Sequence, residues 1–142
     1  MSPVPGDIPR VLSIAGSDSG GGAGIQADLK AIARCGAHGM TAITAITAQN
    51  TVGVNAVEAV SPAMIIAQIE AVASDIGVDA VKVGMLGTTD TIEAVIEGLG
   101  IVGDAPVVVD PVMVSETGAS LLDDEARSAL VDGILPLASF VT

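Results

Sequence analysis

A glycine-rich turn between an apolar run and a helical pattern constrains this sequence most. Residues 10–15 are mainly apolar and are followed by GSDSGGGAG at 16–24. The glycines at 20–22 and 24 lack Cβ atoms, which permits positive φ and lets a ligand approach the backbone closely. The helix predicted over 23–34 directs its first N–H groups at the same place. The turn is therefore a candidate floor for a small-molecule site.

Strand and helix patterns alternate along the rest of the chain. Helical spacing of apolar residues occurs in 23–34, 62–76, 89–99 and 123–135, and extended runs occur in 10–15, 38–49, 52–60, 79–86, 106–110 and 138–142. Gly100 is expected to end the third helix, and 52–60 has the character of a flap or lid. The alternation predicts an α/β fold with a mostly parallel sheet and flanking helices. No linker is evident, so the 142 residues are interpreted as a single domain.

The composition supports this class and argues against others. Half of the residues are hydrophobic, with one Phe and no Tyr or Trp, so the core must consist of small aliphatic residues. Such a core suits buried parallel strands. A formal net charge of −12 disfavours nucleic acid and anionic membranes as partners. Cys35 is the single cysteine, which excludes a disulfide framework. With neither a signal peptide nor a membrane-spanning stretch apparent, a cytoplasmic location is expected.

The strand ends predict where a ligand binds. In parallel α/β sheets, ligands bind beyond the carboxyl ends of the strands. Here those ends carry 16–24, Gln49, Met85 and 110–113. Asp28 is a further candidate, because it lies at the border of the apolar stripe of its helix, where a carboxylate is desolvated unless it has a partner.

Residues 22–27 also fit G-x-G-x-x-A, which is a pattern of dinucleotide-binding turns. That interpretation requires an acidic residue about twenty positions further on to hold the ribose. None occurs between Leu29 and Val57, and no Gly-Lys-Ser/Thr follows the glycines as a P-loop requires. A nicotinamide-dinucleotide binder is therefore a weaker alternative.

Four motifs in order carry a more specific resemblance. They are AGSDSGGGAGIQADLK at 15–30, ITAQNTVGV at 46–54, VKVGMLG at 81–87 and VVVDPVM at 107–113. Together they resemble the hydroxymethylpyrimidine/phosphomethylpyrimidine kinases of thiamine biosynthesis, in the ribokinase-like superfamily. The resemblance extends from Val11 to Thr142. A pyridoxal kinase and a non-catalytic aminopyrimidine-binding module remain as alternatives.

The resemblance implies ATP-dependent phosphorylation of 4-amino-5-hydroxymethyl-2-methylpyrimidine and its monophosphate, with ATP and Mg²⁺ as cofactors. It implies that Gln49 reads the aminopyrimidine edge, since a carboxamide offers both a donor and an acceptor; otherwise Gln49 merely caps a turn. Asp28 would face the substrate, or else be satisfied by the amides of the glycine turn.

The other implied site residues enclose the ring and the phosphate. Gly16 and Ala23 would line the pocket, and Met85 and Val112 would sandwich the ring unless they are plain core residues. Asp110 would lie toward the phosphate and Mg²⁺, to which carboxylates usually contribute one or two contacts. Alternatively, Asp110 only opens a turn.

Family members continue past the position equivalent to Thr142. Their next segment brings an Asn and a Glu toward nucleotide and metal, and a later Gly-Thr-Gly turn forms the anion hole beside the catalytic residue. We therefore interpret the chain as an incomplete, C-terminally truncated kinase domain that contains the substrate-binding half and no catalytic residue, and expect it to lack turnover. The final strand is expected to expose apolar surface. For the complete enzyme, the resemblance implies a homo-oligomer with a small-molecule substrate.

Overall fold

The computed structural model describes residues 8–113, 120 and 122–142. Its main sheet has five parallel strands in the order β2-β1-β5-β6-β7, and a separate antiparallel hairpin joins β3 and β4. The strands are β1 (Arg10–Ala15), β2 (His38–Ile43), β3 (Ala45–Gln49), β4 (Val54–Ala59), β5 (Ala80–Val83), β6 (Val107–Val109) and β7 (Phe140–Val141). The predicted α/β fold with a mostly parallel sheet is confirmed.

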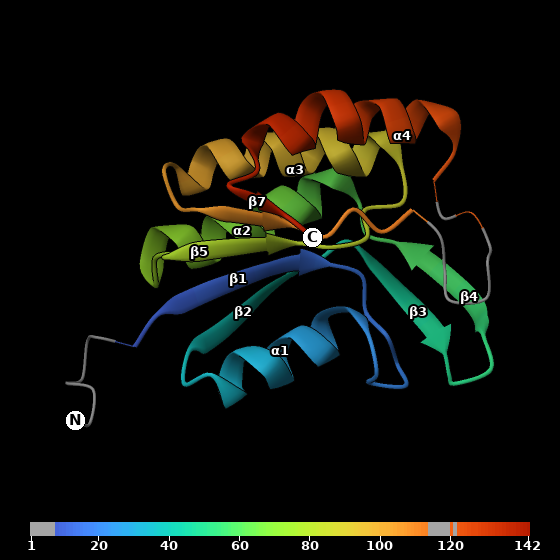
Figure 1. Ribbon diagram of the computed structural model, residues 1–142, viewed down its shortest axis with the longest axis horizontal. Helices are drawn as coiled ribbons and strands as arrows, with labels where there is room; N and C mark the ends of the chain where they lie inside the picture. Colours follow the sequence, from blue (N-terminus) through green and yellow to red (C-terminus); the bar gives the residue numbers. More distant parts are fainter. Residues whose placement is uncertain (1–7, 114–119, 121) are drawn as a thin grey trace.

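Helices cover both faces of this sheet (Figure 1). They are α1 (Gly24–Arg34), α2 (Pro62–Asp75), α3 (Thr89–Val102) and α4 (Asp124–Ala129), with a π-helical turn at Leu130–Ile134 and a 3₁₀ turn at Leu135–Leu137. α1 lies on one face, over β1 and β2, whereas α2, α3 and α4 lie on the other. The β3–β4 hairpin projects beyond the carboxyl ends of β1 and β5.

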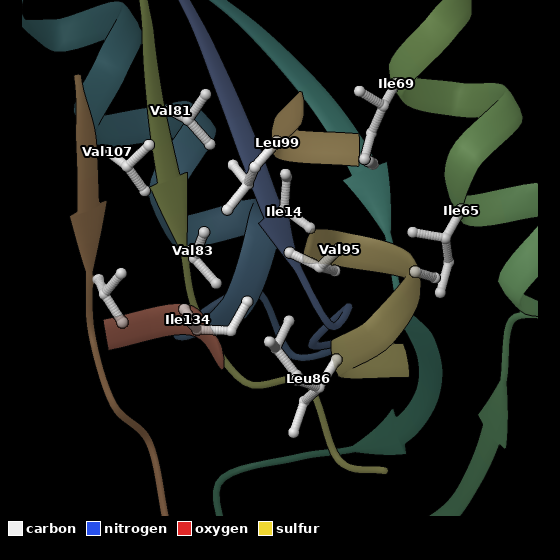
Figure 2. Packing of buried hydrophobic residues seen from close by; sticks show 14 of the residues in the cluster. Ile14, Ile65, Ile69, Val81, Val83, Leu86, Val95, Leu99, Val107 and Ile134 are labelled. Carbon is white, nitrogen blue, oxygen red and sulfur yellow. The ribbon is translucent and has the colours of Figure 1, made fainter. Parts of the chain in front are cut away.

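The core fills the space between the sheet and the layer of α2, α3 and α4 (Figure 2). Alternate strand residues point into it, because successive side chains of a strand face opposite sides. The helices contribute pairs spaced four residues apart, which lie on one helical face. Examples are Leu12, Ile14, Val81 and Val83 from strands, Ile65 and Ile69 from α2, and Val95 and Leu99 from α3. Apart from Met40, the buried hydrophobic residues of the described part are aliphatic, as the composition predicts.

Two helix starts follow from capping chemistry. The Ser61 hydroxyl accepts a hydrogen bond from the Met64 N–H, and Pro62 occupies the first helical position. The Thr88 side chain caps α3 in the same way. The predicted stop at Gly100 is wrong, however, since α3 continues to Val102 before Gly103, at φ +80°, ends it. A glycine inside a helix costs only about 1 kcal/mol relative to alanine, which the packing of α3 offsets.

The predicted strand over 38–49 is in fact two strands in different sheets. β2 ends at Ile43, and the chain turns away at Thr44. The Thr44 N–H donates to the Ala15 carbonyl oxygen, and its buried hydroxyl donates to the Met85 carbonyl oxygen at 3.2 Å. These contacts redirect the chain, so β3 pairs with β4 in an antiparallel hairpin. The flap-like role of this hairpin stays a prediction.

No helix in the described ranges combines the length and the apolarity that crossing a bilayer requires.

In β7, Phe140 and Val141 are 68% and 54% exposed, in line with the apolar surface expected at the final strand.

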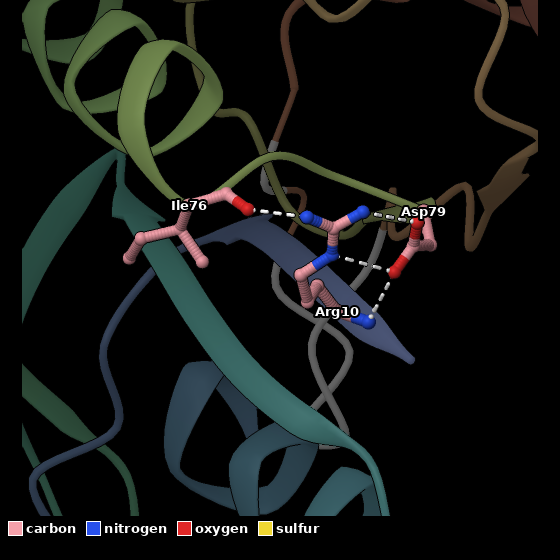
Figure 3. A network of polar contacts seen from close by, with 3 residues as sticks. All are labelled: Arg10, Ile76 and Asp79. Atoms are coloured by element: carbon pink, nitrogen blue, oxygen red, sulfur yellow. Dashed lines mark hydrogen bonds and ion pairs between the residues drawn. The ribbon is translucent and has the colours of Figure 1, made fainter. Parts of the chain in front are cut away.

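One ion pair ties the start of β1 to the segment that leads into β5 (Figure 3). The Arg10 guanidinium donates to both carboxylate oxygens of Asp79, at 2.8 and 2.7 Å, and also to the Ile76 carbonyl oxygen near the end of α2. The Arg10 N–H donates to the same carboxylate at 2.8 Å. Hydrogen bonding from Arg10 lowers the pKa of Asp79 to about 2.

The Asp79 pair predicts a specific loss of stability in acid. A folded-state pKa of about 2 lies below the unfolded value of about 3.9, so the contribution is present above that value and is lost as the pH falls toward 2. We expect Asp79→Asn to flatten the dependence of unfolding free energy on pH between about 4 and 2. Urea denaturation across this range measures the effect. Equal slopes for Asp79→Asn and the wild type would contradict it.

Candidate functional site

The candidate site lies where the strand order of the sheet reverses direction. From β1, the chain passes first to β2 on one side and later to β5 on the other. Crevices at such switch points are where α/β sheets bind ligands. Gly16 follows β1 and Met85 follows β5, and a Cβ on Gly16 would lie 3.1 Å from the Met85 Cε atom. The structure thus brings these two predicted site residues together, and the absence of a side chain at position 16 lets the Met85 methyl group pack against the backbone there.

The glycine turn after β1 is organised around Asp18, which sequence reasoning did not single out. Asp18 is 6% exposed. Its Oδ1 accepts from the Gly20 N–H at 2.8 Å, and its Oδ2 accepts from the N–H groups of Gly22 and Ala23 at 3.0 and 2.8 Å. Desolvation by burial raises the pKa of Asp18, but hydrogen bonds from the turn amides outweigh it, and the pKa is lowered. An ionised carboxylate therefore holds the turn.

This carboxylate changes how the turn is interpreted. Among the N–H groups at the start of the helix, that of Ala23 donates to Asp18 and that of Ile25 donates to the Gly16 carbonyl oxygen at 2.9 Å. A phosphate at the same place would meet occupied donors and a like charge. The arrangement therefore disfavours the dinucleotide alternative. An Asp two residues before a glycine run is the signal that could have revealed this role, since Asp side chains commonly bond backbone N–H groups of turns.

The turn is also joined to β3. The Ser17 N–H donates to the Ala45 carbonyl oxygen at 2.8 Å, and the Thr47 hydroxyl donates to the Ser17 carbonyl oxygen at 2.6 Å. The Ser19 hydroxyl donates to the Gln49 carbonyl oxygen at 2.6 Å and accepts from the Gln49 N–H at 2.8 Å. These bonds place the end of β3 directly beside the turn.

The Gln49 side chain is half-buried at this junction. Its Oε1 atom lies 3.3 Å from the Thr47 hydroxyl, and this is its one side-chain contact with another described polar group. A hydroxyl donates a single proton, and the shorter bond to Ser17 uses it. The Gln49 carboxamide is thus left able to bond a ligand.

Asp28 on α1 has partners of its own. Its Oδ2 accepts from the Ser13 hydroxyl at 2.6 Å and from the Lys82 ammonium at 2.9 Å. The Lys82 and Asp28 side chains are 25% and 18% exposed, so the pair is largely removed from water. The alternative in which the turn amides satisfy Asp28 does not apply, because they serve Asp18. Lys82 is the partner that the half-buried Asp28 needs.

Asp110 and Val112 follow β6 at the same edge of the sheet. The Asp110 N–H donates to the Val83 carbonyl oxygen at 2.9 Å, which places Asp110 across from the end of β5. The Val112 N–H donates to the Asp110 carbonyl oxygen at 2.8 Å, forming a tight turn. Both residues are half-buried, whereas Ala23, at the start of α1, is exposed.

The fit of Mg²⁺ to this edge depends on Asp110. The described ranges hold no group of three or more His, Cys, Asp or Glu residues arranged to bind a metal. Mg²⁺ usually takes one or two carboxylates and completes its shell with phosphate oxygens and water. Asp110 thus fits as one contribution to a magnesium–phosphate complex.

Two open hollows lie elsewhere on the surface. One is lined by α2 residues and Ile101, and the other lies near the end of α3 and is lined in part by Gly103 and Leu137. Neither contains a predicted site residue. We place the site at the switch point because polar groups and glycine backbone converge there.

The glycine turn predicts different outcomes for two glycine-to-alanine variants. Gly24 has φ +58°, and a Cβ there would overlap the Gly16 carbonyl oxygen. We expect Gly24→Ala to destabilise the protein by about 2 kcal/mol or more. Gly100, in α3 with open space around it, is the matched control, and Gly100→Ala should be neutral or stabilising by up to about 1 kcal/mol. Urea denaturation measures both, and a Gly24→Ala variant as stable as Gly100→Ala would contradict the strained turn.

Comparison with known proteins shows the family. The model of the family described as Phosphomethylpyrimidine kinase matches residues 18–142. A hydroxymethylpyrimidine/phosphomethylpyrimidine kinase of Rhizobium meliloti (strain 1021) is 56% identical over 131 residues, which cover 92% of this chain and 49% of the relative.

Solved structures agree with this result. Phosphomethylpyrimidine kinase from Clostridium difficile 630 has a TM-score of 0.89 and 50% identity, covering 94% of this chain and 58% of that chain. Pyridoxal kinase from Staphylococcus aureus in complex with AMP-PCP has a TM-score of 0.81 and 37% identity, covering 94% of this chain and 48% of that chain. The chain spans about half the length of the Rhizobium relative. It belongs to the phosphomethylpyrimidine kinase family, with the ribokinase-like fold that the resemblance implies.

Proposed function

We propose that this chain supplies the pyrimidine-binding part of an ATP-dependent kinase that phosphorylates 4-amino-5-hydroxymethyl-2-methylpyrimidine and its monophosphate in thiamine diphosphate biosynthesis. The observation that carries the proposal is the Gln49 carboxamide, held beside the glycine turn at the switch point with a single weak polar contact among the described residues. Family membership supports the same reaction class.

The chemistry of the site suits a flat, uncharged heterocycle. A carboxamide offers an acceptor and two donors, which match the exocyclic amine and the adjacent ring nitrogen of an aminopyrimidine. We assign the Gly16 backbone to the pocket wall, and the Met85 thioether, whose methyl group packs against Gly16, offers a polarisable apolar surface to the ring. We assign Val112 to the opposite side of the ring and Ala23 to the pocket wall. The described residues thus bind and orient the ring.

ATP with Mg²⁺ would supply the phosphoryl group and neutralise part of its charge. Among the described residues, we assign Asp110 to the phosphate and Mg²⁺ side. Staphylococcus aureus pyridoxal kinase has been solved with AMP-PCP and with ADP, which supports a nucleotide as the second substrate. Phosphoryl transfer depends mainly on positioning and charge stabilisation. The part played by Gln49, and by Asp28 if it faces the substrate, is to hold the hydroxymethyl group toward the phosphate.

A pyridoxal kinase is the second candidate, since the structure of the Staphylococcus aureus pyridoxal kinase in complex with pyridoxal also matches this chain, at 36% identity. Pyridoxal has a ring nitrogen and a hydroxymethyl group but no exocyclic amine. A site that uses both ends of a carboxamide should therefore prefer the aminopyrimidine. Calorimetric titration of the two compounds separates the candidates, because the pyridoxal alternative requires the reverse order of affinity.

The proposal predicts the effect of removing the Gln49 carboxamide. Gln49→Ala should weaken binding of the aminopyrimidine alcohol by about tenfold or more, since two hydrogen bonds of about 1 kcal/mol each are lost. Asn55→Ala is the matched control, because it removes an exposed carboxamide from β4 of the same hairpin and should leave the affinity unchanged. Isothermal titration calorimetry measures both. Unchanged affinity in Gln49→Ala would refute the proposed recognition.

A further inference from the structure

The segment 17–19 lies beside β3 and is hydrogen-bonded to it, although the two do not form a regular β-ladder. Its contacts are made with every second residue of β3, namely Ala45, Thr47 and Gln49. Ala45 and Thr47 are buried, whereas Ile46 between them is 55% exposed. The main-chain groups of alternate strand residues point to the same edge, so the turn lies along one edge of β3. The flap and the pocket floor are therefore fastened to each other at three successive points.

The last of these points involves the proposed recognition residue itself. The Ser19 hydroxyl donates to the Gln49 carbonyl oxygen at 2.6 Å and accepts from the Gln49 N–H at 2.8 Å. One side chain thus satisfies both main-chain groups of a residue thirty positions away. The register of β3 against β4 shifts between Ala48 and Gln49, so the regular ladder is interrupted at this residue. Such irregularities re-aim side chains and loosen pairing.

We infer that Ser19 is a positioning residue that fixes the direction of the Gln49 carboxamide over the glycine turn; the inference rests on the proposed function. Ser19 acts through the Gln49 backbone and does not touch the ligand. Without the Ser19 hydroxyl, the described contacts of β3 with the turn are those of Ala45 and Thr47. The Gln49 carboxamide must then be ordered when the ligand binds. Ordering a side chain on binding reduces affinity.

The test is a double-mutant cycle in the 142-residue chain, titrated with 4-amino-5-hydroxymethyl-2-methylpyrimidine. Ser19→Ala should weaken binding about five- to tenfold, the effect of one lost hydrogen bond of roughly average strength. Ser19→Thr keeps the hydroxyl and should restore most of the affinity. In the Gln49→Ala background, Ser19→Ala should have no further effect, because Ser19 acts only through Gln49.

A matched control and a ligand-free measurement complete the design. Ser61→Ala removes a serine whose hydroxyl accepts from the Met64 N–H at the start of α2, and it should leave the affinity unchanged. Hydrogen exchange should be faster at the Gln49 amide in Ser19→Ala, because that amide donates to the Ser19 hydroxyl. In the buried strand β5, exchange should stay as in the wild type.

The outcomes separate this inference from the proposed function. If Ser19→Ala binds as the wild type does, or weakens binding equally with and without Gln49, the positioning role is overturned while the proposed function stands. Unchanged exchange at the Gln49 amide also overturns it. If the wild-type chain does not bind the pyrimidine, or Gln49→Ala binds it normally, the proposed function fails and the Ser19 inference fails with it.

Discussion

The buried Asp18 carboxylate is the interaction on which the candidate site depends. Four of the five residues from Gly20 to Gly24 are glycines, whose backbone loses the most conformational freedom on folding. Charge-assisted hydrogen bonds to the N–H groups of Gly20, Gly22 and Ala23 offset that cost. The glycine turn is thus held in place by its own side chain, and the negative charge of that side chain disfavours a phosphate at this position.

Local chemistry explains which features could be predicted from the sequence. Arg10–Ala15, the helix that ends before Gly36, and the Ser61-Pro62 start of α2 depend on residues adjacent in the chain. The division of 38–49 into two strands does not depend on adjacent residues. The segment has similar β-branched and small residues on both sides of Thr44, so the sequence alone does not mark the break. Contacts of Thr44 with Ala15 and Met85, distant in sequence, make the break.

The same distinction applies to the site. Gly16, Gln49, Met85 and Asp110 could be placed at strand ends from the pattern alone, and the structure puts all four at the carboxyl edge of the sheet or its flap. Asp18 and Ser19 lay inside the recognised motif. The glycine run after Asp18 is a local signal for its role in the turn. The partner of Ser19 lies thirty residues away and becomes evident only when the backbone is in place.

Asp28 combines a structural role with the capacity to accept a further hydrogen bond. Lys82 lies on a mostly apolar strand, and burying its ammonium without a partner would be unfavourable. Both partners of Asp28, Ser13 and Lys82, bond to Oδ2. A carboxylate has two oxygens with about four acceptor sites, so Oδ1 keeps acceptor capacity. The ion pair with Lys82 therefore leaves Asp28 able to accept a further hydrogen bond, for example from a substrate. The ion pair instead fixes α1 against β5 and so determines where that second oxygen points.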